Sequence, residues 1–463
     1  MMTVEEEIDV WRVLLFGRCG TELLVLRTPS GLRLPDLRVP RGQRVAPNLN
    51  AEAKRLWKLD TVCLLPFETA HSDLSAADGK YHVMELCGPE ELARVAPDFM
   101  QLSAVKEDSF ADPRDYLTVQ RGMGLAATGL EEESRGPFSE FGAFGRISAW
   151  VEEQLRPLGL RLDGNFRQLQ ATASFALIRF DTNRGAVWFK AVGVPNLREF
   201  SITRSLTAAF PQYLPELLAA KTDWNAWLTA EAPGQGLFES SDPATWCRAA
   251  EVLAELQIAS LQHTPELLAA DAHDVRPEKL RSVVDPFFLV MEETMQAQTR
   301  TTVPKLSKQE IRAVGERVTE ALLELEEAGI PEALNHLDLN PCNVVVSTSS
   351  CTFLDWAEAA VGNPFFSLEY LRQQFLQVFP GPVEAELDFT HAYANRWKRI
   401  LGEKITEDWP RLVPLAAAFA FAASTLSWND PKMSQRPKVA AFLRSLVRRM
   451  HRESKQIRTS RAA

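Results

Sequence analysis

Short runs of hydrophobic residues bounded by polar turns dominate the first 120 positions of the chain. "WRVLLFG" and "TELLVLRT" are apolar runs of strand length joined by the turn "RCG", and "YHVMELCG" is a third run of this kind. "AEAKRLWKLD" instead spaces its apolar residues as an amphipathic helix does. The pattern predicts a small α/β or β-rich domain over residues 1–119.

The hydrophobic pattern then breaks and restarts. Residues 120–145, "QRGMGLAATGLEEESRGPFSEFGAFG", are rich in glycine, serine and acidic residues, which predicts a linker. An amphipathic helix follows, and then two strands, "SFALIRFD" and "GAVWFKAVG", separated by the turn "TNRG". We expect a β-rich part over residues 146–232, and a mainly helical part over residues 233–463.

Length and charge limit the class of protein. A chain of 463 residues is too long for one ordinary domain, and 46% hydrophobic with 24% charged residues is typical of a soluble globular protein. The net charge of −10 argues against general nucleic-acid binding and permits a cationic substrate. The basic stretch "RSLVRRMHRESKQIRTSR" permits a nucleic-acid or membrane patch, or a frayed helix with solvated charges.

Cysteine spacing and the apolar runs indicate a cytoplasmic protein. The six cysteines are scattered without a CxxC pair, as reduced thiols of a cytosolic chain would be. The acidic N-terminus does not resemble a signal peptide. The longest apolar run, residues 412–426, is too short to span a membrane and predicts a buried helix.

The stretch "NHLDLNPCNVVVSTSSCTFLDWAEA", residues 335–359, combines polar groups with apolar strands. "VVV" and "CTFLD" form the two arms of a predicted hairpin with "STSS" as its turn. The start of one arm lies beside the end of the other, which brings Asn343 and Asp355 together at the open end. His336 and Asp338 lie on the loop that leads into this end.

Carboxylate and amide oxygens of this kind suit Mg²⁺, which binds a few such ligands together with water and phosphate. One of the two aspartates is then available to orient a nucleophile and accept its proton. This division of roles is what phosphoryl transfer to a hydroxyl requires. A polar loop capped by a β-hairpin is the alternative for any one of these residues taken alone.

The sequence "HLDLNPCNVVV…FLDWAEAAVGNPFF" resembles the motifs of the aminoglycoside phosphotransferase and choline kinase family. The resemblance covers about residues 145–430. It implies an α+β, bilobal protein-kinase-like fold, with a small β-rich N-lobe over residues 146–232 and a large helical C-lobe over residues 233–463. A separate small α/β domain precedes this fold.

The resemblance also implies the roles of the motif residues. Asp338 is the catalytic base, Asn343 and Asp355 hold Mg²⁺, and His336 is a structural brace in the catalytic loop, residues 335–356. The family's glycines in this loop are replaced by Leu337 and Cys342. These two replacements put the efficiency of turnover in doubt.

A kinase-like site also needs a cation on the phosphates of ATP. Lys190 in "VWFKAV" is either a solubility device of an edge strand or a phosphate ligand. Glu199, on the next predicted helix, resembles the glutamate that pairs with the lysine in this family. Ser174 and the alanines near it stand where a glycine-rich loop is expected, so phosphate contacts there come from the backbone or the hydroxyl.

The segment "WLTAEAPGQGL" falls where the family places the hinge between its lobes, with backbone groups of Glu231 and Ala232 meeting the adenine. The N-terminal domain faintly resembles a Nudix hydrolase. Its helix lacks the acidic metal-binding cluster, since only Glu52 and Asp60 lie nearby. The resemblance therefore implies a degenerate domain that is used for binding or packing.

The resulting expectation is an enzyme that uses ATP and Mg²⁺ to phosphorylate a hydroxyl of a small molecule. The alternative is a pseudokinase that binds nucleotide and acts as a regulatory or partner-binding module. The family's acceptors include aminoglycosides, macrolides and choline, and the acidic charge favours a cationic acceptor without nucleic acid or membrane as partner. Glu358, Glu369 and Asp388 could meet such a cation, or could be surface carboxylates.

Overall fold

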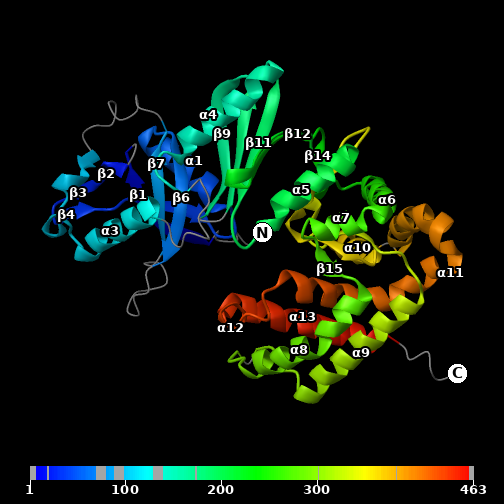
Figure 1. The fold of residues 1–463 in the computed structure, drawn as a ribbon. Coiled ribbons are helices and arrows are strands. Elements are labelled where there is room, and N and C mark those ends of the chain that lie inside the picture. Colours follow the sequence, from blue (N-terminus) through cyan, green and yellow to red (C-terminus); the bar gives the residue numbers. More distant parts are fainter. Residues whose placement is uncertain are drawn as a thin grey trace. The chain divides into compact units, whose positions relative to one another are not determined.

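The chain forms two compact units (Figure 1). The computed structural model describes residues 7–17, 20–68, 80–87, 99–128, 139–172, 175–300, 302–381 and 383–457. The first unit comprises residues 1–200 and 216–231, and the second comprises residues 201–215 and 232–463. The segments predicted as residues 1–119 and 146–232 thus share one unit, and their division into two domains stays a prediction.

The N-terminal part of the first unit is built on a mixed sheet of six strands in the order β6-β7-β1-β2-β8, with β5 paired to β1. Its strands are β1 (Ile8–Phe16), β2 (Glu22–Leu24), β5 (Asp36–Pro40), β6 (Thr61–Glu68), β7 (Lys80–Leu86) and β8 (Phe99–Gln101). Strands β3 (Leu26–Thr28) and β4 (Gly31–Arg33) form a separate hairpin. The strands predicted at "WRVLLFG", "TELLVLRT" and "YHVMELCG" correspond to parts of this set.

The centre of this sheet is buried on both faces. Leu14 and Phe16 of β1 pack in the cluster that includes helix α3 (Pro113–Thr128). Val13 and Leu15 point the other way, into the cluster that includes helix α1 (Val45–Trp57). A strand covered on both faces reads as a continuous apolar run rather than an alternating one, as "VLLF" does. Helix α3 extends to residue 128, into the segment predicted as a linker.

A second sheet of five strands follows, in the order β12-β13-β11-β10-β9. The strands are β9 (Leu162–Thr172), β10 (Phe175–Thr182), β11 (Gly185–Val192), β12 (Leu217–Lys221) and β13 (Ala226–Ala230), and all their pairings are antiparallel. Helix α4 (Ala143–Leu155) covers one face of this sheet through Ile147, Val151 and Leu155 (Figure 1). The hydrophobic pattern predicted β10 and β11, but not β9 or β12.

The two sheets of the first unit are joined by a buried amide. Gln168 of β9 is 4% exposed, and its side chain bonds both the N–H and the C=O of Cys63 in β6 at 2.8 Å. Asn50 of α1 donates to the same amide oxygen at 3.1 Å. Because a buried amide must find partners for its donors and its acceptor, these bonds fix β9 against the N-terminal sheet.

The second unit is mainly helical, as predicted. Its helices are α6 (Pro243–Ala259), α7 (Thr264–Ala269), α8 (Pro277–Gln296), α9 (Lys308–Glu327), α10 (Phe365–Val378), α11 (Val383–Thr425, interrupted at Gly402), α12 (Pro431–Ser434) and α13 (Pro437–Gln456). Helix α5 (Arg198–Ala209) begins in the first unit and ends in the second. None of the described helices is long and apolar enough to cross a bilayer.

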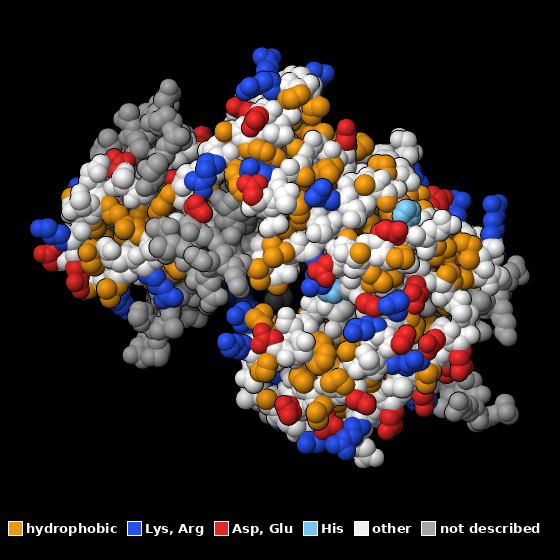
Figure 2. Space-filling view, in the orientation of Figure 1, with side chains coloured by type: hydrophobic (Ala, Val, Ile, Leu, Met, Phe, Trp, Pro, Cys, Tyr) orange, Lys and Arg blue, Asp and Glu red, His pale blue; other side chains and the backbone are white. Residues whose placement is uncertain are grey.

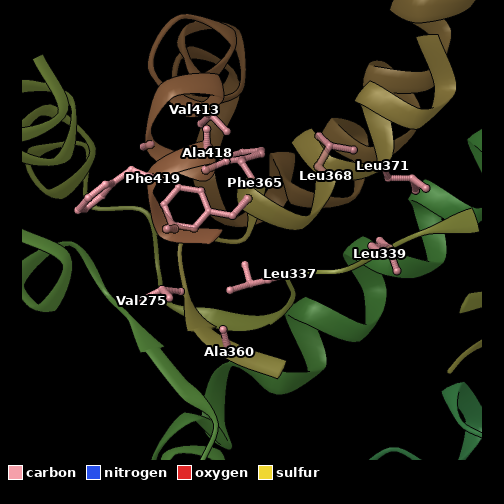
Figure 3. Packing of buried hydrophobic residues seen from close by; sticks show 14 of the residues in the cluster. Val275, Leu337, Leu339, Ala360, Phe365, Leu368, Leu371, Val413, Ala418 and Phe419 are labelled. Carbon is pink, nitrogen blue, oxygen red and sulfur yellow. The ribbon is translucent and has the colours of Figure 1, made fainter. Parts of the chain in front are cut away.

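Two small sheets complete the second unit. Their strands are β14 (Gln235–Gly236), β17 (Val344–Val346) and β18 (Cys351–Phe353) in one, and β15 (His273–Val275), β19 (Ala359–Gly362) and β16 (Ala333–His336) in the other. One large apolar cluster connects these strands with the helices, and Figure 3 shows part of it. Residues 412–420 of α11 are buried in this cluster, so the buried helix predicted there is confirmed.

The basic C-terminal helix is packed rather than frayed. Leu443, Val447 and Met450 of α13 are fully buried, and Arg444 and Arg448 bond carbonyl and amide oxygens of α8 and the segment after it. Residues 458–463 of the basic stretch lie outside the described residues. On the face drawn in Figure 2, basic and acidic side chains are interspersed, and the described residues form no extended basic patch on that face.

Candidate active site

The predicted hairpin forms and brings two polar residues to its open end. Strands β17 and β18 pair antiparallel with Val344 opposite Phe353. The N–H of Leu354 then donates to the carbonyl of Asn343 at 2.8 Å. Asn343 and Asp355 therefore flank the last backbone bond of the hairpin, at the place that the sequence pattern predicted.

Asp338 is held by the burial of the residues on either side of it. Leu337 and Leu339 are 3% and 0% exposed, and both point into the apolar cluster (Figure 3). The carbonyl oxygen of Asp338 accepts bonds from the N–H of Asn340 at 2.7 Å and from Nδ2 of Asn343 at 3.1 Å. Leu337 thus packs in the core, while the Asp338 side chain stays partly exposed.

His336 is a fully buried link between β16 and the hairpin. Its Nε2 donates to the carbonyl of Leu354 at 2.8 Å, and its ring lies 4.7 Å from that of Trp356. Burial lowers the pKa of His336, and its Nδ1 has no hydrogen-bond partner among the described residues. A neutral ring that donates through Nε2 fits both observations, and its position suits the brace that the resemblance implied.

Asp355 stands in a left-handed backbone conformation, with φ of 62° and ψ of 68°. Aspartate is one of the few residues other than glycine that tolerate this region. The next residue, Trp356, is 2% exposed and its Nε1 donates to the carbonyl of Phe353 at 3.2 Å. The buried tryptophan anchors the turn, so that the Asp355 side chain is left exposed.

The donor set at the hairpin fits Mg²⁺. The bond from Nδ2 of Asn343 to Asp338 leaves Oδ1 as the oxygen that this amide can offer to a metal. The described residues contain no cluster of three or more histidine, cysteine or acidic residues that could enclose a metal ion. One amide and one carboxylate are a small set, and Mg²⁺ is the metal that completes such a set with water and phosphate oxygens.

Three further residues support this loop, and the sequence pattern did not identify them. Asn335 accepts bonds at its Oδ1 from the N–H and the hydroxyl of Ser367 at 3.2 and 2.8 Å, and the N–H of His336 donates to the same hydroxyl at 2.8 Å. Tyr370 donates its hydroxyl to Oδ1 of Asp338 at 2.7 Å. Ser367 and Tyr370 are three residues apart on α10, a spacing that puts them on one helix face and could have identified them as a pair.

Lys190 and Glu199 form a buried ion pair within the first unit. Lys190 is 8% exposed and Glu199, in the first turn of α5, is 2% exposed. The ammonium also lies 5.1 Å from the ring centre of Phe175 and 5.6 Å from that of Trp227. Because β11 has β10 on one side and β13 on the other, the edge-strand interpretation of Lys190 is wrong.

Glu231 and Ala232, the predicted hinge residues, stand at the boundary between the two units. The N–H of Glu231 donates to the carbonyl of Ala186 at 3.1 Å. Its carboxylate accepts from Arg179 at 2.7 Å and from Trp188 at 3.3 Å, and the bond from Arg179 lowers the pKa of Glu231. The predicted adenine contacts of this segment stay a prediction, and Ser174 lies outside the described residues.

Among its described residues, the N-terminal part has no group of three or more histidine, cysteine or acidic residues that could hold a metal ion. Glu52 of α1 pairs with Arg55 at 2.8 Å, and Asp60 pairs with Lys54. A hollow of about 1130 Å³ lies within the first unit, lined by residues of α1, α4 and β9 among others. The Nudix-like interpretation stays a prediction.

The three carboxylates considered for a cationic acceptor lie in different surroundings. Glu369 is fully buried and pairs with Arg372 at 2.8 Å, so its interpretation as a surface carboxylate is wrong. The carboxylate of Glu358 lies within hydrogen-bond distance of Nε2 of His273, at 3.1 Å. Asp388 is exposed and lines a shallow hollow of about 510 Å³ between α6 and α11.

Neither a protein-family model nor a curated protein matches this chain. Among solved structures, it is similar to a macrolide 2′-phosphotransferase from Brachybacterium faecium, with 16% identity, a TM-score of 0.42, and coverage of 69% of this chain and 100% of the other. A choline kinase from Streptococcus pneumoniae gives 12%, 0.43, and 66% and 99% coverage. An ethanolamine kinase from Plasmodium vivax gives 11%, 0.44, and 77% and 97% coverage.

These TM-scores describe distant likenesses, so the roles of individual residues rest on the geometry of this chain alone. These solved structures carry the names of the enzyme group that the catalytic-loop motif resembles in sequence. The chain is similar to the macrolide and aminoglycoside phosphotransferases and to the choline and ethanolamine kinases.

Proposed function

We propose that this protein is a phosphotransferase that uses ATP and Mg²⁺ to phosphorylate a hydroxyl group of a small molecule. The observation that supports this most strongly is the arrangement of one loop and one hairpin in the second unit. Asn343 bonds the backbone of Asp338 and, with Asp355, flanks the open end of the hairpin. The proposed proton acceptor and the two proposed metal ligands thus stand on one loop and hairpin joined by these hydrogen bonds.

Asp338 would act as the general base. The acceptor hydroxyl gives its proton to the Asp338 carboxylate while its oxygen forms a bond to the γ-phosphorus of ATP. The bond between that phosphorus and the β,γ-bridging oxygen breaks at the same time, and ADP leaves. Asp338 is suited to this role because its backbone is fixed while its carboxylate stays partly exposed.

The remaining groups would hold the nucleotide. Asn343 and Asp355 are the residues that would bind Mg²⁺, which when bound neutralises charge on the phosphates. Lys190 would contact the phosphates, and Glu199 would hold the lysine in place through their ion pair. The net charge of −10 favours a cationic acceptor, such as an amine-bearing alcohol or an amino sugar.

The first test is thermal unfolding with and without Mg-ATP, on the wild type and on Asp355→Asn. A ligand that binds only the folded state at a hundred times its Kd stabilises by about 2.7 kcal/mol. We expect a clear rise in melting temperature that requires Mg²⁺ and is lost in Asp355→Asn. Asp388→Asn, an exposed aspartate of the same unit, is the matched control and should keep the rise.

A nucleotide-binding module without turnover is the second candidate function. It is favoured by Leu337 and Cys342 at the positions of family glycines. The burial of Leu337 argues against it, because that side chain packs within the apolar cluster of the second unit. Stabilisation by Mg-ATP without ATP consumption, across a panel of alcohol acceptors, would favour this second candidate.

A further inference from the structure

Tyr370 touches the proposed catalytic base directly. Its hydroxyl donates to Oδ1 of Asp338 at 2.7 Å, which is a short bond to a carboxylate. Tyr370 lies on α10, outside the catalytic loop and the hairpin. The loop does not need this bond to hold the backbone of Asp338, because Asn340 and Asn343 already donate to its carbonyl oxygen.

The position of the phenol is fixed by its helix. Glu369 and Leu371, on either side of Tyr370, are both fully buried, and the Tyr370 ring lies 6.3 Å from that of Phe421 in α11. Burial, followed by the bond to Asp338, raises the pKa of Tyr370, so the phenol keeps its proton at neutral pH. The hydroxyl is therefore a permanent donor at a fixed place.

The carboxylate of Asp338 would otherwise be able to turn. Its backbone is fixed, but the side chain is partly exposed and has two rotatable bonds, so without a fixed partner either oxygen could turn toward solvent. The phenol removes this freedom at one oxygen, because Oδ1 must stay within reach of the Tyr370 hydroxyl. The other oxygen, Oδ2, is then the one that can accept a proton from an acceptor hydroxyl.

We propose that Tyr370 is a positioning residue that reserves Oδ2 of Asp338 for the acceptor hydroxyl and keeps water from Oδ1. This inference rests on the proposed function, since it gives Asp338 the role of base. It predicts that the tyrosine favours phosphoryl transfer to an organic acceptor over hydrolysis of ATP. Without the phenol hydroxyl, a water molecule can occupy its place, and a water bonded to the base is a competing nucleophile.

The experiment measures phosphate release from Mg-ATP alone, with no organic acceptor, in the wild type and in Tyr370→Phe. The substitution removes one oxygen and keeps the ring. We expect the rate of hydrolysis to rise about three- to tenfold, a fraction of the ~10²- to 10⁴-fold that a general base contributes. Adding Asp338→Asn to the Tyr370→Phe protein should abolish the rise.

Tyr393→Phe is the matched control. Tyr393 is a buried tyrosine of α11 whose hydroxyl donates to Oε1 of Gln257 at 2.6 Å, so its loss removes a phenol hydrogen bond in the same unit. We expect it to lower the melting temperature and to leave the hydrolysis rate unchanged. A purely structural role of Tyr370 would make the two variants behave alike.

Two results would overturn the inference about Tyr370. One is an unchanged or lower rate of hydrolysis in Tyr370→Phe, and the other is a rise that persists after Asp338→Asn is added. Stabilisation by Mg-ATP, measured on the same proteins, separates these failures from failure of the proposed function. If Mg-ATP stabilises neither the wild type nor Tyr370→Phe, the phosphotransferase proposal falls, and the role of Tyr370 falls with it.

Discussion

The two groups of polar residues in this protein are held in different ways. In the first unit, Lys190 and Glu199 are placed by regular structure: the lysine by a strand paired on both sides, and the glutamate by the first turn of a helix. In the second unit, Asp338 and Asp355 stand on irregular backbone. Their positions depend on bonds between side chains and main chain and on burial of the neighbouring residues.

The two regions should therefore differ in how substitutions affect the stability and the function of the protein. The lysine–glutamate pair is enclosed, so removal of either member takes the buried charge of the other away from this partner and destabilises the fold. The Asp338 side chain is partly exposed and the Asp355 side chain is exposed, and the backbone under them is fixed by other residues. We therefore expect substitutions in the first region to affect stability and function together, and substitutions of the loop carboxylates to affect function alone.

The largest effect is expected for Asp338→Asn. Loss of the general base should lower turnover by about 10²- to 10⁴-fold, once an acceptor has been found by screening. The melting temperature and its rise with Mg-ATP should both be kept, because the substituted carboxylate is partly exposed and the amide can still accept the bond from Tyr370. Steady-state kinetics and thermal unfolding on one preparation test this, and substantial residual turnover would remove Asp338 from the role of base.

The next effect is expected for Lys190→Met. Removal of one partner from a buried ion pair costs about 3–5 kcal/mol of unfolding free energy, since the remaining charge loses its counter-ion. The double variant Lys190→Met/Glu199→Leu should recover much of this loss, but should not recover stabilisation by Mg-ATP. Denaturant unfolding of both variants measures the unfolding free energy. Thermal unfolding with and without Mg-ATP measures the stabilisation by nucleotide.

A result in which Lys190→Met is as stable as the wild type would contradict the contrast between the two regions. It would mean that the ion pair contributes little to the fold of the first unit. Arg179→Met is a useful control from the same sheet, because its ion pairs with Glu231 and Asp181 are partly exposed and pairs near the surface contribute about 0–1 kcal/mol.

The smallest effect is expected from pH. Burial lowers the pKa of His336 in the folded protein, whereas the unfolded chain binds a proton near pH 6.5 (about the ordinary histidine value). The unfolded state then holds more protons in acid, so the unfolding free energy falls as the pH drops through and below that value. His336→Gln should lose less stability than the wild type between about pH 7 and about pH 5.

Thermal unfolding across this pH range measures the difference between the two proteins. The buried His82 of the N-terminal sheet, whose pKa burial lowers to about 4, contributes acid sensitivity to both proteins and cancels in the comparison. Equal pH dependence in the two proteins would show that His336 is already charged in the fold, or that it does not titrate differently on unfolding.

Local pattern predicted the elements that carry the site. The strands around Lys190 and the hairpin around Asn343 and Asp355 are short apolar runs bounded by turn residues, and such runs depend on contacts between near neighbours in sequence. Strand β9 did not show this pattern, because it carries polar residues such as the buried Gln168, which is satisfied by bonds to β6 and α1. From sequence alone, a polar residue such as this glutamine favours a loop, because its buried hydrogen-bond partners are not known.

The sequence by itself determined which chemical groups the loop offers and that the hairpin would bring Asn343 and Asp355 together, because an antiparallel pairing of adjacent strands follows from local pattern. Only the tertiary structure decided that Lys190 lies in a central strand, that Glu369 is buried among arginines, and that Tyr370 touches Asp338. Each of these contacts joins elements whose pairing depends on packing of the whole unit, which no short stretch of residues encodes.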